Sequence, residues 1–144
     1  MAKDARKKLI DGLNEDLANE YTAIISYMLF SRLVSGAHRM ELAAFFEGEI
    51  VDELEHAKYL SHKIVALGGM PTTAPAEVRL SQDNKEMLQL ALEAETETIG
   101  RYTKRIEQAE AAGELALKVE LENLVAEETR HKEDLARILK GWRD

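Results

Sequence analysis

The stretch Glu53-Leu54-Glu55-His56 is the part of the sequence from which the fold can be predicted. It lies in the middle of an apolar-periodic segment. Residues three apart on an α-helix share a face, so the Glu53 carboxylate and the His56 imidazole can converge on one point. Such a pair suits a divalent transition metal. Because Glu is abundant in the chain, the pair carries weight only if other residues complete a site.

The composition is that of one helical domain, which we expect to cover residues 1–144. Hydrophobic residues make up 45% of the chain and charged residues 32%, with only 2 Pro and 8 Gly. Ala, Leu, Glu and Lys dominate, and these residues favour helices. The chain carries 27 acidic against 19 basic residues and a net charge of −8. This excess of acid argues against a nucleic-acid-binding domain.

The sequence also predicts a cytoplasmic protein that does not bind a membrane. Cys is absent, which excludes disulfides and thiolate metal sites and agrees with a reducing compartment. The N-terminus lacks the apolar core of a signal peptide. The longest near-apolar run, residues 23–30, is too short to span a bilayer.

Four apolar stripes, at spacings of three and four residues, predict four helices of similar length. A long irregular stretch over residues 68–82 separates the second from the third. A connector of this length crosses the bundle and leaves its two flanking helices parallel. At its end, Asp83 with Glu86 three residues later resembles a capping box. The predicted helices span about residues 5–34, 38–67, 83–111 and 114–140.

Each stripe is apolar except for one Glu near its middle. A carboxylate that faces a core is costly unless it is paired, protonated or bound to a metal. One such Glu can be a misassigned surface residue, but four at matching heights indicate a shared site. The four residues are Glu20, Glu53, Glu95 and Glu128.

The two halves of the chain repeat with an offset of 75 residues, as expected for two copies of one helical hairpin. Packed about a pseudo-two-fold axis, the copies bring four Glu and two His to one locus, which matches a pair of metal ions in a carboxylate-bridged site. Oxygen and imidazole ligands together favour Fe(II) or Mn(II). The repeated pairs include Glu20/Glu95, Glu53/Glu128, His56/His131 and Tyr27/Tyr102.

On these residues the sequence resembles the ferritin-like di-iron carboxylate superfamily, and most of all bacterioferritin. The similar strings are residues 13–20, 52–57 and 127–131. The resemblance implies an all-α fold, a ferritin-like four-helix bundle with a long crossover between helices 2 and 3. It also implies two Fe or Mn ions per chain, bridged by Glu53 and Glu128. The implied metal ligands and catalytic residues are Glu20, Glu53, His56, Glu95, Glu128 and His131.

Several positions refine or depart from the family pattern. Tyr27 falls where these proteins often carry a tyrosine near the metals, and is a candidate electron donor. Leu54 stands where bacterioferritin has a haem-ligating Met, so haem is not expected. Gly48 replaces a His of an inner-surface iron site in that family, although Asp52 remains. We interpret Glu49 and Asp52 as part of a solvated face, although Glu49, one turn before Glu53, could help iron approach the site.

The function that the resemblance implies is that of a ferroxidase-type oxidoreductase. Its partners are Fe(II) and oxygen or hydrogen peroxide, and iron storage is a further expected capacity. Two alternatives stay open. One is a peroxide-detoxifying di-manganese or di-iron enzyme similar to manganese catalase or rubrerythrin, and the other is a starvation-type protective shell. We expect a homo-oligomer with a dimer as building block. Too few residues follow His131 for the fifth helix that helps close a 24-subunit cage, so assembly of that cage is an open question, and a 12-subunit cage or a plain dimer stays open beside it.

Overall fold

The computed structural model describes residues 2–143, and these residues form four helices joined by loops. α1 begins before residue 5 because Ala2 and Lys3 tolerate a helix and Asp4 places a negative charge in its first turn. No helix in this range combines the length and apolarity that a bilayer crossing requires. The helices are α1 (Ala2–Leu33), α2 (Arg39–Ala66), α3 (Asn84–Ala111) and α4 (Leu115–Leu139).

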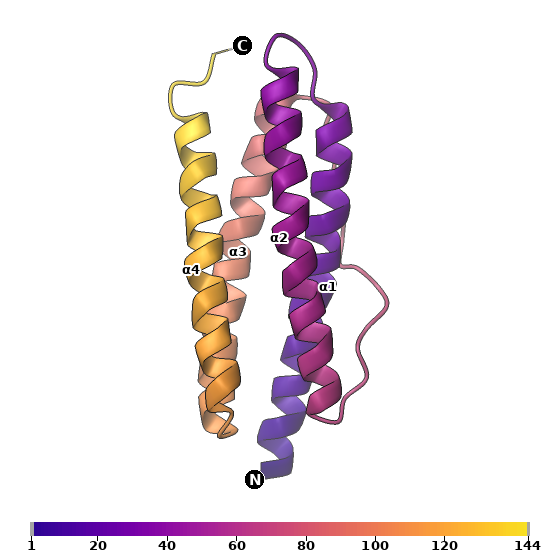
Figure 1. Ribbon diagram of the computed structural model, residues 1–144, viewed down its shortest axis with the longest axis vertical. Helices are drawn as coiled ribbons and strands as arrows, with labels where there is room; N and C mark the ends of the chain where they lie inside the picture. Colours follow the sequence, from indigo (N-terminus) through magenta and orange to yellow (C-terminus); the bar gives the residue numbers. More distant parts are fainter. Residues whose placement is uncertain (1, 144) are drawn as a thin grey trace.

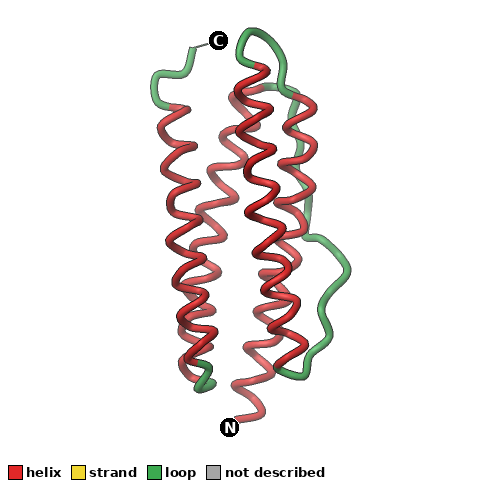
Figure 2. The backbone as a smooth tube through the Cα atoms, viewed as in Figure 1, coloured by secondary structure: helices red, strands yellow, loops and turns green. Residues whose placement is uncertain are grey.

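The helices pack as two antiparallel hairpins, α1 with α2 and α3 with α4 (Figure 1). The hairpins meet along α1 and α3. The long connector runs beside α1 from one end of the bundle to the other (Figure 2). α2 and α3 therefore point in the same direction, which confirms the ferritin-like connectivity predicted from the length of the connector.

Hydrogen bonds from α1 fix the path of the connector. The Asn14 side chain donates to the Met70 carbonyl at 3.1 Å and accepts from the Thr72 backbone N–H at 2.8 Å. Higher on the same helix, the Thr22 hydroxyl donates to the Ala76 carbonyl at 2.9 Å. These bonds satisfy backbone groups that would otherwise need water, so the connector follows one course along the helix.

The ends of α2 and α3 follow local sequence rules. Gly68 adopts φ +91° directly after α2, a conformation that glycine tolerates without steric cost. At the start of α3, the Asp83 carboxylate accepts the Glu86 backbone N–H at 2.9 Å. The Glu86 carboxylate, however, accepts from the Ser81 hydroxyl instead of from Asp83 N–H. Only half of the predicted capping box is therefore formed.

The core consists of two apolar clusters, one on either side of a central layer of carboxylates. Leucines dominate one cluster, and aromatic residues and Met occupy much of the other. Because both clusters exclude water, charges in the layer between them interact at a low effective dielectric. Members of the first include Leu9, Leu13, Leu60, Leu117 and Leu121. Members of the second include Phe30, Phe46, Met87, Leu88 and Leu135.

Candidate metal centre

The four helices bring the six residues singled out in the sequence to one buried locus midway along the bundle. Each helix contributes the Glu that interrupts its apolar stripe, and α2 and α4 each add a His one turn further on. The side chains are 1–6% exposed, so most of the charged layer is shielded from bulk water. The six are Glu20, Glu53, His56, Glu95, Glu128 and His131.

One group of side chains surrounds the His56 ring. Its Nδ1 lies 2.9 Å from Glu128 Oε1, 3.6 Å from Glu53 Oε2 and 3.7 Å from Glu20 Oε2. One ligand atom from each of the four residues lies within 4.8 Å of those of the other three. A single divalent ion placed among these atoms could contact all four residues.

A second group surrounds the His131 ring. Its Nδ1 lies 3.6 Å from Glu53 Oε1, 3.9 Å from Glu128 Oε2 and 4.0 Å from Glu95 Oε1. Glu49 Oε2 is closer than any of these, at 2.9 Å. Glu53 and Glu128 thus each direct one oxygen to His56 and the other to His131, which is the geometry of a carboxylate that bridges two ions.

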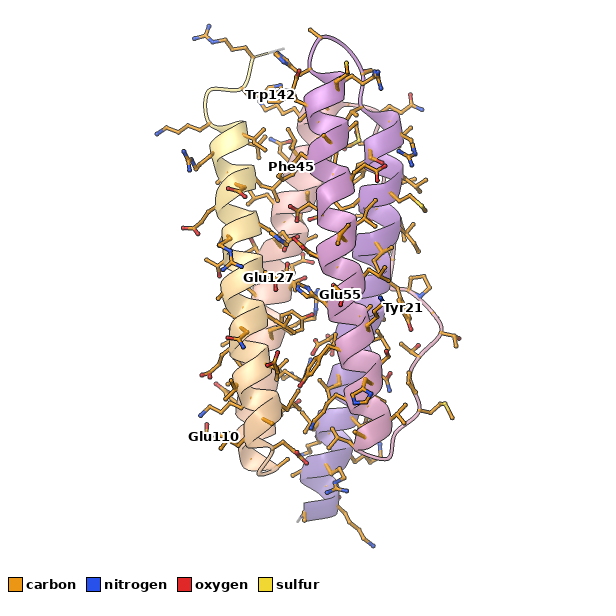
Figure 3. The ribbon with its side chains drawn as sticks, in the orientation of Figure 1. Tyr21, Phe45, Glu55, Glu110, Glu127 and Trp142 are labelled. Carbon is orange, nitrogen blue, oxygen red and sulfur yellow. The ribbon has the colours of Figure 1, made fainter. Side chains whose placement is uncertain are left out.

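Outer carboxylates fix the orientation of both imidazoles. His56 Nε2 lies 3.1 Å from Glu127 Oε2, and His131 Nε2 lies 3.0 Å from Asp52 Oδ2. Figure 3 shows Glu127 on α4 level with the middle of α2, where Glu55 is labelled. When Nε2–H donates to these carboxylates, Nδ1 is left with its lone pair towards the centre, the tautomer that a metal requires.

Two tyrosines orient the two carboxylates that are not shared. The Tyr102 hydroxyl donates to Glu20 Oε1, and the Tyr27 hydroxyl donates to Glu95 Oε1. Each bond crosses between α1 and α3 and leaves the other carboxylate oxygen free. Burial, with the nearby Glu53 and Glu49 charges, raises the pKa of Tyr27 well above its usual value, so the phenol keeps its proton and remains a donor.

The centre contains a concentration of buried polar atoms without hydrogen bonds, and these atoms test whether the residues fit a metal. Buried side-chain atoms of the described residues seldom lack a partner. Here five carboxylate oxygens and two ring nitrogens do so together, as expected of ligand atoms for hard or borderline cations. They are Glu20 Oε2, Glu49 Oε2, Glu53 Oε1, Glu95 Oε2, Glu128 Oε1, His56 Nδ1 and His131 Nδ1.

Mutual repulsion dominates the electrostatics of the metal-free site. Burial and the neighbouring Glu20 and Glu128 carboxylates raise the pKa of Glu53 well above its usual range. Burial lowers the pKa of His56, but the carboxylates of Glu128 and Glu20 outweigh it and raise that pKa to about 11. Burial likewise opposes ionisation of His131, yet Glu49 leads the groups that raise its pKa to about 9. Protons therefore neutralise part of the charge that divalent ions could neutralise.

Without metal, we expect thermal stability to fall as pH rises from 6.5 towards 9. A His whose pKa is raised by folding stabilises the folded state fully at a pH below its unfolded pKa of about 6.5, and this stabilisation is lost as the pH rises through its folded pKa. For His131, whose folded pKa is about 9, the loss is on the order of 3 kcal/mol. Glu53, with its raised pKa, changes stability in the same direction. Glu20, whose pKa is lowered by Glu53 and His56 despite burial, is already ionised in this range.

Melting curves in chelator at pH 6.5, 7.5 and 8.5 measure this slope. Mn(II) must displace the same protons, so it should raise the melting temperature more at pH 8.5 than at pH 6.5. A metal-free protein that becomes more stable over this range would contradict the assignment of protons to the two histidines.

Glu49 is the residue that sequence reasoning placed wrongly. It was expected on a solvated face, but it is 7% exposed and faces His131. The signal was its position one turn before Glu53, which puts both side chains on one face of α2. Asp52, expected on the same solvated face, is partly exposed and contacts the outer nitrogen of His131.

Comparisons with known proteins identify the family of this fold. Residues 10–143 match the family described as Ferritin: Ferritin-like domain. A bacterioferritin from Streptomyces coelicolor is 34% identical over 125 residues, which cover 86% of this chain and 75% of that protein. One from Mycobacterium bovis is 32% identical over 120 residues, 83% of this chain and 76% of that protein.

A solved structure is more similar still. The crystal structure of a ferritin-like, diiron-carboxylate protein from Bacillus anthracis is 52% identical to this chain. The match covers 94% of this chain and 97% of the solved one, with a TM-score of 0.92. With its four-helix bundle, its long crossover and its Glu and His side chains at the centre, the chain belongs to the ferritin-like family.

Proposed function

We propose that this protein is a ferroxidase that takes two Fe(II) ions at the centre of its bundle and oxidises them with oxygen or hydrogen peroxide. One observation carries the proposal. Glu53 and Glu128 each offer one oxygen to the His56 side and one to the His131 side. Carboxylates shared in this way hold two ions about 3.5–4 Å apart, the separation typical of two-metal sites.

The remaining ligands divide between the two ions. Glu20 and His56 complete one coordination sphere, and Glu95 and His131 complete the other. Oxygen and imidazole donors favour Fe(II) or Mn(II), and the chain has no Cys to select a softer metal. Iron is proposed over manganese because the bacterioferritins and the diiron-carboxylate structure are the relatives found.

The electron balance requires both ions. Two Fe(II) ions supply one electron each, so oxygen with two protons from solvent gives hydrogen peroxide, and hydrogen peroxide with two protons gives two waters. The chain holds the ions close enough to act on one oxidant molecule and keeps bulk water out. Tyr27 positions Glu95 through its hydroxyl, and its service as an electron donor stays a prediction.

Two openings offer separate routes to the centre. An open groove of about 580 Å³ between α2 and α4 reaches His131. Its lining has more carboxylates, among them Asp52 and Glu127, than arginines, which are Arg130 and Arg137. Such a groove concentrates cations. A narrower pocket of about 80 Å³ between α1 and α3 is lined by Tyr27 and Glu95 among others, and is of a size for oxygen or peroxide.

Association with further copies of the chain is part of the proposal, because storage of a mineral needs a closed shell. Val51, Leu54 and Val65 are exposed apolar residues on one side of α2, and exposed apolar side chains are the kind that copies of a protein bury against each other. The number of subunits sets whether iron is stored or only oxidised.

Anaerobic addition of two Fe(II) per chain, followed by air, tests the activity. We expect bound Fe(III) and a particle larger than one chain by light scattering. The oxygen consumed should be about one per two irons when peroxide is released, and about one per four irons when that peroxide oxidises a second pair. A manganese-loaded protein that evolves oxygen from peroxide without oxidising Fe(II) would instead identify a peroxide-detoxifying enzyme. A dimer that holds two irons per chain would exclude storage and leave the oxidation intact.

A further inference from the structure

The internal repeat is broken at one buried position of the centre. The 75-residue offset matches every pair around the two metals, including the outer carboxylates Asp52 and Glu127. At Glu49, however, the partner position is Leu124. Leu124 is buried in the leucine-rich cluster, whereas Glu49 places a carboxylate against His131. The two halves of the site therefore differ by one charged ligand.

Glu49 has the properties of a ligand and not of a surface acid. Its Oε2 lies 2.9 Å from His131 Nδ1, although neither atom makes a hydrogen bond. It also belongs to a set of four residues, with Glu53, Glu95 and His131, whose ligand atoms lie within 4.8 Å of one another. In the metal-free site a proton on the His131 ring stabilises this buried carboxylate, and a cation bound between the two atoms would take the place of that proton.

The difference in charge favours one metal position over the other. Glu53 and Glu128 serve both positions. Among residues 2–143, Glu20 is the one unshared carboxylate that faces His56 Nδ1, whereas both Glu95 and Glu49 face His131 Nδ1. Affinity for hard divalent cations rises with the number of charged oxygen ligands. Glu49 also lines the acidic groove between α2 and α4, so an arriving cation meets this side of the site first.

We infer that the two metal positions are inequivalent, and that the one at His131 takes Glu49 as an additional ligand, binds its ion more tightly and fills first. The inference rests on the proposed two-metal site and adds an order of loading to it. The His56 position then fills second, since it lacks a counterpart of Glu49.

An anaerobic titration of the metal-free protein with Co(II) tests the order in which the two positions fill, without any turnover. Calorimetry and visible absorption monitor the binding. We expect two binding steps of different affinity. His131→Ala should remove the tighter step and His56→Ala the weaker one. Glu49→Gln should weaken the tighter step by at least about tenfold and leave the weaker step within about twofold.

Leu124→Glu provides the mirror-image variant. It places a carboxylate at the position related to Glu49, and should strengthen the weaker step until the two approach each other. Melting curves of each metal-free variant confirm that it folds. If Glu49→Gln bound two Co(II) ions with unchanged affinities, the inference about Glu49 would be overturned, but the two-metal site on which the proposed function rests would stand. A protein that binds no Co(II) would instead overturn the two-metal site itself.

Discussion

Glu53→Ala is expected to lose both metal ions, so that Fe(II) oxidation falls to the rate seen in buffer alone. Glu53 directs its two oxygens towards both His56 and His131, so its removal takes a ligand from each ion and the bridge between them. Removing an unshared ligand such as Glu20 should instead weaken one position and leave the other occupied. Equilibrium dialysis against Fe(II) without oxygen, followed by aerobic oxidation, measures both effects.

Glu55→Ala is the matched control for this prediction. Glu55 lies two residues along the same helix, but its side chain is 67% exposed and pairs only with Lys58 at the surface. Its removal changes the charge of α2 equally and should leave two irons bound and oxidation unaltered. If Glu53→Ala still bound two ions and oxidised them at the normal rate, the carboxylate bridge would be excluded as the basis of the activity.

Most of the centre could be predicted from the sequence because its residues follow two patterns, the helical spacing within each helix and the 75-residue repeat between the two halves of the chain. Each candidate ligand interrupts an apolar stripe at helical spacing, and each has a partner 75 residues away, as Glu20 has Glu95. The length of the connector between α2 and α3 then predicted that these two helices run parallel. These signals are local or repetitive, so they need no knowledge of which surfaces meet.

The features that escaped prediction are those that break the repeat. Glu49 has Leu124 as its partner position, so the repeat gave it no support, and an acidic residue beside Asp52 resembles a solvated face. The buried pair Asp16 and Arg105 is separated by 89 residues. Nothing in the periodicity of α1 or α3 shows that these two charges meet, because their contact depends on how the helices face each other.

Arg105→Ala is expected to destabilise the protein by about 3–5 kcal/mol, a large part of the stability of a domain of this size. Arg105 is 2% exposed, and its guanidinium donates to both Asp16 oxygens at 2.8 and 3.1 Å. Its loss leaves a buried carboxylate without its hydrogen-bonded counter-charge, and the weaker attraction of Arg101 remains. Gly12 makes room for this pair, since a Cβ there would lie 2.0 Å from Arg105 Nη1.

Urea unfolding of the metal-free protein measures this loss, and the double variant Asp16→Ala/Arg105→Met separates charge from packing. The pseudo-symmetric positions of Asp16 and Arg105 are Ala91 and Phe30, which pack in the apolar cluster. An apolar pair is thus compatible with this architecture, and the double variant should regain most of the stability that the single variant loses.

A pH comparison tests the electrostatic cause of this loss. Burial already raises the pKa of Asp16 against the opposing effect of Arg105. Without the arginine that pKa should rise further, so the deficit of Arg105→Ala should shrink between pH 7 and pH 5 as the carboxyl takes up a proton. If the loss of unfolding free energy in Arg105→Ala did not change with pH and was equally large in the double variant, Arg105 would stabilise the bundle by filling space. The pair lies one turn from Glu20 and Tyr102, so its loss should also loosen the hydrogen bond that orients this ligand.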